Sequence, residues 1–138
     1  MTYTITTTVA LPWTEALART RDALSAQGFG ILTEINVRST FEAKLGAEAA
    51  DAVGDYVILG ACNPALASRA IAAEPEIGAL LPCNVVVRRN KAADETTVEA
   101  IDPETMVQLS SAPPVKEVAD DAGKRLRKAL ASLSETTE

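Results

Sequence analysis

The 138-residue sequence contains no histidine, only two cysteines and few aromatic side chains. Without histidine, the chain by itself cannot form a Ser-His-Asp or Cys-His catalytic group, nor a zinc or iron site with imidazole ligands. Two thiols are also too few for a structural zinc site built from cysteines. These absences favour a protein that is not an enzyme, and the sequence predicts no cofactor, no catalytic residue and no metal ligand.

Basic charge is also scarce, since 13 lysines and arginines stand against 19 acidic residues and give a net charge of −6. Nucleic acid or an anionic membrane would require a concentrated basic surface, so neither is expected as a partner. No apolar run approaches the ~20 residues of a membrane helix, and no signal segment is recognisable at the N-terminus. The expected location is the cytoplasm, where both cysteines would remain reduced.

The hydrophobic pattern predicts one domain over residues 1–134, with a frayed tail at residues 135–138. Alternating or β-branched segments predict strands at residues 2–11, 30–37, 55–61, 83–89 and 96–101. Helices are expected between them and at the C-terminus, while residues 47–54 fit either a helical turn or a loop. The order β-α-β-α-β-α-β-β-α predicts an α+β fold, a mostly antiparallel sheet with helices on one face.

The second helix is expected to begin at Ser39, because Ser39 and Glu42 have the spacing of a capping box. In the strand before it, Leu32, Glu34 and Asn36 share one side. Glu34 stands between apolar neighbours, so either its face is open to water or its carboxylate has a dedicated partner. If helices leave this face uncovered, the row could line a ligand groove or meet a second copy across a two-fold axis.

Two cysteine-asparagine pairs stand at junctions between elements. Cys62 and Asn63 end an apolar run and open a helix, with Asn63 as the expected N-cap. Cys83 and Asn84 open a β-branched strand. The candidate ligand-binding residues are Glu34, Asn36, Cys62, Asn63, Cys83, Asn84 and Asp102. Capping and turn hydrogen bonds are the plainer interpretation of Asn63, Asn84 and Asp102.

The two cysteines allow several interpretations. Cys62 precedes a helix N-terminus, where free N–H groups stabilise a thiolate, so Cys62 and Cys83 could form a redox pair. That pair requires Cα atoms within ~7 Å. Two small buried hydrophobic side chains at strand ends are the plainer interpretation. A soft metal ion held by the thiolates with Glu34 or Asp102 is a further alternative.

Several motifs together resemble the domain-of-unknown-function 302 (DUF302) family over nearly the whole chain. They are Gly28-Phe29-Gly30, Thr33-Glu34-Ile35, Gly60-Ala61-Cys62-Asn63-Pro64, Leu81-Pro82-Cys83-Asn84-Val85 and Ala100-Ile101-Asp102-Pro103. The resemblance implies an α+β domain with a TATA-binding-protein-like strand arrangement, often dimeric, and this label does not imply DNA binding. It brings no established activity. The expected function is a homodimeric module for small-ligand binding or assembly, with thiol redox chemistry as the alternative.

Overall fold

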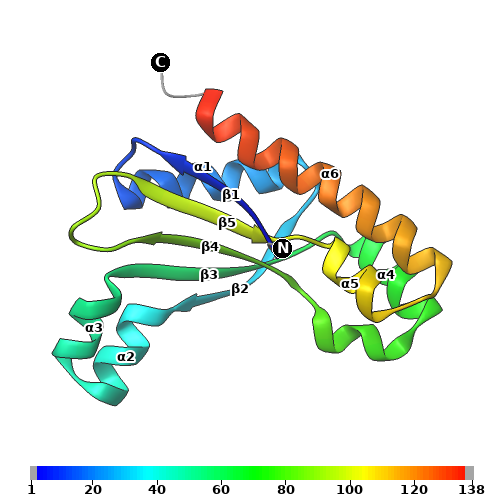
Figure 1. Cartoon of the computed structure of the whole chain (residues 1–138), viewed down its shortest axis with the longest axis horizontal. Helices are drawn as coiled ribbons and strands as arrows, with labels where there is room; N and C mark the ends of the chain where they lie inside the picture. Colours follow the sequence, from blue (N-terminus) through cyan, green and yellow to red (C-terminus); the bar gives the residue numbers. More distant parts are fainter. Residues whose placement is uncertain (1–2, 136–138) are drawn as a thin grey trace.

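The computed structural model describes residues 3–135 and confirms the predicted α+β class, with one antiparallel sheet of five strands. The strands are β1 (Thr4–Val9), β2 (Gly30–Asn36), β3 (Asp55–Cys62), β4 (Cys83–Arg89) and β5 (Thr96–Ile101). They lie in the order β1-β5-β4-β3-β2, so the central strands come from the middle of the chain (Figure 1). The predicted bounds of β4 and β5 are confirmed.

Helical segments connect the strands, except β4 and β5, and the last helix follows α5. They are α1 (Trp13–Ala26), α2 (Val37–Leu45), α3 (Ala47–Val53), α4 (Pro64–Ala73), the 3₁₀ helix η1 (Pro75–Leu80), α5 (Glu104–Leu109) and α6 (Pro113–Glu135). Residues 47–54 therefore contain a helix. Of the frayed tail predicted at residues 135–138, Glu135 is the last residue of α6, and residues 136–138 lie outside the described residues. None of the helices in the described part of the chain combines the length and apolar character needed to cross a bilayer.

The second helix begins two residues earlier than predicted. The side-chain oxygen of Asn36 accepts a hydrogen bond from the backbone N–H of Ser39 at 2.9 Å, so Asn36 is the N-cap. The predicted capping box of Ser39 and Glu42 is wrong. Asparagine is at least as good an N-cap as serine, and β2 ends at Asn36, so the helix starts at the first residue able to cap it.

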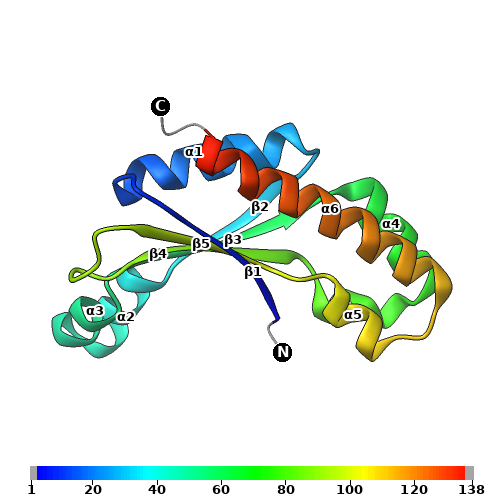
Figure 2. The same cartoon turned by 45° about the horizontal axis from the view of Figure 1, so that its top comes forward.

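The helices that pack on the sheet, α1 and α6, lie on one of its faces (Figure 2). The core between these two helices and the sheet contains Val57, Leu59, Val85, Val87, Val98 and Leu126. A second core lies beyond one end of the sheet, among α4, η1, α5 and the first half of α6, and it contains Leu66, Ile77, Met106, Val115 and Val118. The pair α2 and α3 lies at the opposite end, beyond β2 and β3 (Figure 1).

The other face of the sheet is left uncovered by α1 and α6. Side chains alternate along a strand, so the neighbours of the buried valines point to this face. The registers place Tyr56 opposite Arg88, and Val86 opposite both Ile58 and Glu99. The expectation that one face is only partly shielded therefore agrees with the structure.

Candidate functional site

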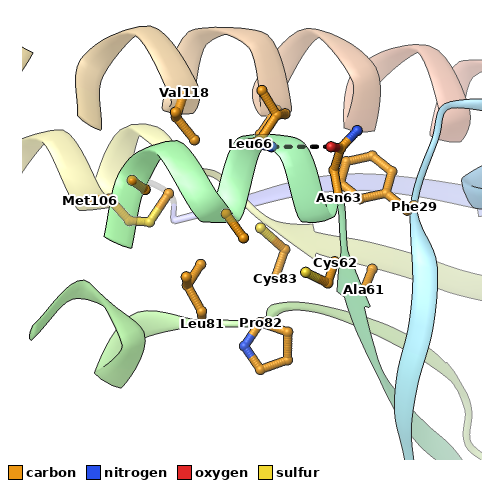
Figure 3. A pocket seen from close by; sticks show the side chains of 13 residues that line it. Phe29, Ala61, Cys62, Asn63, Leu66, Leu81, Pro82, Cys83, Met106 and Val118 are labelled. Atoms are coloured by element: carbon orange, nitrogen blue, oxygen red, sulfur yellow. Dashed lines mark hydrogen bonds between the residues drawn. The ribbon is translucent and has the colours of Figure 1, made fainter. Parts of the chain in front are cut away.

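A small apolar cavity lies where the two cores meet, beneath the N-terminus of α4 (Figure 3). Its volume is about 30 Å³, which is enough for an ion or a water molecule. Cys62 and Cys83 line it from the ends of β3 and β4, and Met106 reaches it from α5. Apolar side chains such as Leu66 and Val118 complete the wall.

The pairing of β3 with β4 brings the two cysteines together. Ala61 lies directly opposite Cys83, and Cys62 is the next residue of β3. Both cysteines line the cavity. The predicted path of strand, helix and strand through residues 60–85 is confirmed, and it returns the chain beside its starting point. Both thiols are free, Cys83 being buried and Cys62 partly exposed.

The environment of Cys83 keeps its thiol protonated. Burial raises the pKa of Cys83 to about 11, and the negative charge that Cys62 can carry adds to this shift. Since the thiolate is the reactive form, Cys83 is a poor nucleophile near neutral pH.

Three of the candidate residues hold the backbone in place. Asn63 is confirmed as the N-cap of α4, accepting a backbone N–H at 3.2 Å, and Asn36 caps α2 in the same way. Asp102 accepts the backbone N–H of Glu104 at 3.0 Å and binds the guanidinium of Arg127 at 3.3 Å. Their oxygens are thus engaged in capping and ion pairing.

The predicted row of Leu32, Glu34 and Asn36 on the uncovered face is wrong. A bulge at Leu32 shifts the register of β2, so Glu34 lies opposite Leu59, whose side chain is fully buried on the face that the helices cover. The carboxylate of Glu34 makes an ion pair with Arg21 of α1, which is the dedicated partner considered as one alternative. One extra residue in a strand is enough to exchange the faces.

The metal ligands considered as a further alternative do not converge either. Among residues 3–135, no group of three or more cysteine, aspartate or glutamate side chains could hold a metal ion. Glu34 and Asp102 are each paired with an arginine instead. The ligand set of two thiolates with Glu34 or Asp102 is therefore wrong.

A larger concavity of about 450 Å³ lies on the uncovered face. Asn84 lines it, together with Tyr56, Arg88 and Glu99. Arg88 donates its Nε–H to Glu99 at 2.5 Å, and this hydrogen bond raises the pKa of Arg88 above its ordinary value. Tyr56, Arg88 and Glu99 were not among the predicted site residues, although strand alternation together with the β3–β4 pairing would have placed Tyr56 beside Arg88.

Comparison with known proteins identifies the family. The family described as "Domain of unknown function DUF302" matches residues 5–133, and the chain belongs to it. The fold is similar to the crystal structure of an uncharacterized conserved protein DUF302 from Bacillus stearothermophilus, with a TM-score of 0.82 and 28% sequence identity over 95% of this chain and 98% of that chain. No curated protein matches the sequence. The resemblance predicted from the motifs is confirmed, and it adds no specific activity.

The thiol of Cys83 should react slowly in the native protein. With a pKa of about 11, the rate of reaction with an aromatic disulfide reagent should rise about tenfold per pH unit from about pH 8 towards that value. The rate is measured in Cys62→Ser, where Cys83 is the remaining thiol. The same variant in denaturant serves as the control and should react at an ordinary rate; equally fast native reaction near pH 8 would contradict the buried, protonated state.

Proposed function

We propose that this DUF302 protein is a homodimeric small-ligand-binding module whose ligand occupies the concavity on the uncovered face of the sheet. The observation that carries the proposal is the size and lining of this concavity. Its volume of about 450 Å³ falls within the range of ~300–1,000 Å³ typical of ligand pockets. Tyr56 offers a flat apolar surface, and Asn84, Arg88 and Glu99 offer donors and acceptors.

The lining favours a ligand with a planar apolar part and a carboxylate. The register places Tyr56 directly opposite Arg88, so one molecule can contact the ring and the guanidinium together. Arg88 uses Nε for Glu99, and its two terminal nitrogens can meet a carboxylate side by side. The ion pair with Glu99 fixes the guanidinium in place before the ligand arrives, which lowers the entropic cost of binding.

Benzoate is a suitable probe, because it has one ring and one carboxylate. In two-dimensional amide NMR spectra, we expect benzoate to shift the signals of Tyr56, Asn84 and Arg88 in a saturable manner. Val86→Glu adds bulk and negative charge to the same face, and it should weaken binding by roughly tenfold or more.

The matched control is Ala131→Glu, which adds the same side chain to an exposed position of α6 and should bind as the wild type does. Shifts that do not saturate, or a Val86→Glu variant that binds normally, would contradict the proposal.

We propose that assembly uses β2, one of the two edge strands of the sheet. Leu32 and Ile35 are 65% and 48% exposed, and apolar side chains of this size on an edge strand favour pairing with another chain. A two-fold axis beside β2 would align it antiparallel with its copy and extend the sheet across both subunits. Dimerisation would then leave the concavity of each subunit open.

Ile35→Lys should convert the dimer into a monomer, because a charged side chain on an edge strand opposes pairing with another chain. Sedimentation equilibrium measures the mass. Leu109→Lys changes a similarly exposed side chain, 72% exposed on α5, and should leave the dimer intact. A monomeric wild type, or an Ile35→Lys variant that still dimerises, would contradict pairing through β2.

Thiol redox chemistry is the second candidate, favoured by the presence of both free cysteines on one cavity wall. Cys62 and Cys83 would lose two electrons and two protons to a disulfide oxidant such as oxidised glutathione and form a disulfide. The raised pKa of Cys83 assigns the attack to Cys62. A mass loss of two hydrogens after such treatment, absent in Cys83→Ser, would support this candidate. We also propose a cytoplasmic location, where both thiols remain reduced between turnovers.

A further inference from the structure

Three sulfur atoms reach the cavity beneath α4 from three different elements. Cys62, Cys83 and Met106 belong to β3, β4 and α5, and all three line the same cavity (Figure 3). Cys83 and Met106 also line an adjoining cavity of about 70 Å³, so they stand together on the wall between the two spaces. Met106 is 5% exposed, and its thioether is held within the second core.

The wall of this cavity offers almost no hard ligand. Apart from the sulfur atoms and backbone groups, the polar side chain that lines it is that of Asn63. Its oxygen already accepts a hydrogen bond from the N–H of Leu66 at 3.2 Å. No carboxylate or hydroxyl group of the described residues lines the cavity. The chemistry of the wall is therefore sulfur surrounded by hydrocarbon.

We propose that Cys62, Cys83 and Met106 form a binding site for one soft monovalent metal ion of the copper(I) class. Thiolate and thioether sulfur are the ligands that select copper(I) over harder ions. Zinc prefers four ligands in a tetrahedron, and the cavity offers three sulfurs, one of them a neutral thioether. The volume of about 30 Å³ suits a single ion and is far below the ~300 Å³ of small organic ligand sites.

The charges at the site can be balanced. When the ion binds, two metal–thiolate bonds form, and each thiol that was protonated releases its proton to solvent. Two thiolates and one monovalent cation leave a charge of −1 in the cavity. The positive end of the α4 helix dipole, directly after Asn63, favours a negative charge there.

The metal site goes beyond the proposed ligand site, because it uses the other side of β4 and none of the residues of the concavity. It uses the same thiols as the redox candidate and adds Met106. Disulfide formation does not need a thioether, whereas the metal site does. Met106→Leu keeps nearly the same volume and removes the sulfur, so this variant separates the two roles.

The test is an anaerobic titration of the reduced full chain with copper(I) in competition with bicinchoninate, a coloured copper(I) chelator. We expect one copper(I) per chain. Cys62→Ser and Cys83→Ser should each weaken binding by about 100-fold, and Met106→Leu by about tenfold. Thermal unfolding establishes that each variant is folded, and X-ray absorption of the wild-type complex should show sulfur ligands only.

Three results would overturn the proposal: failure of the folded wild type to compete with bicinchoninate, a Met106→Leu variant that binds copper(I) as the wild type does, or displacement of the bound ion by equimolar zinc. Treatment of Met106→Leu with oxidised glutathione gives the independent readout. Normal disulfide formation together with weakened copper(I) binding supports the metal site, and loss of both overturns the specific role of the thioether.

Discussion

The packing of α6 along the length of the molecule is the interaction on which the rest of the structure depends. Its second half buries Leu126, Leu130 and Leu133 against the sheet and α1. Its first half buries Val115 and Val118 against α4, η1 and α5. Each fully buried leucine or valine contributes about 1.5–3 kcal/mol. One helix therefore joins both cores, and the cavity with the cysteines lies where the two cores meet.

This one-sided coverage gives the two faces of β4 different surroundings. Cys83 and Asn84 are adjacent in sequence, yet Cys83 lines the sulfur-rich cavity and Asn84 lines the concavity on the uncovered face. Val86 and Val87 are likewise adjacent in β4, and they point to the uncovered and the covered face respectively. The proposed metal site and the proposed ligand site therefore use opposite faces of the same strand and share no lining residue.

Sequence patterns predicted the parts of the fold that local interactions decide. β4 and β5 have β-branched residues in the correct alternation, and Asn63 with Pro64 specifies the start of α4. The start of α2 was missed because two good caps, Asn36 and Ser39, compete within three residues. The choice between the two caps depends on where β2 ends, and it ends at Asn36.

The candidate site was predicted in part. The convergence of Cys62 and Cys83 follows from the β3–β4 pairing, which no local pattern determines. The bulge at Leu32 depends on how β2 meets β3, and it moved Glu34 to the other face. Met106 resembles an ordinary core methionine in sequence, because only the path of the chain through α5 brings it to the cysteines.

The two proposed sites lie on different faces of the sheet because α1 and α6 cover one face and leave the other open. The most direct measurement compares the free energies of unfolding of Val86→Ser and Val87→Ser, neighbours on β4 that point to opposite faces. Val87 is fully buried, so its replacement should cost about 3 kcal/mol. Val86 is half-buried on the open face, so its replacement should cost less than about 1 kcal/mol. Equal losses would show that both faces are buried and would contradict the account.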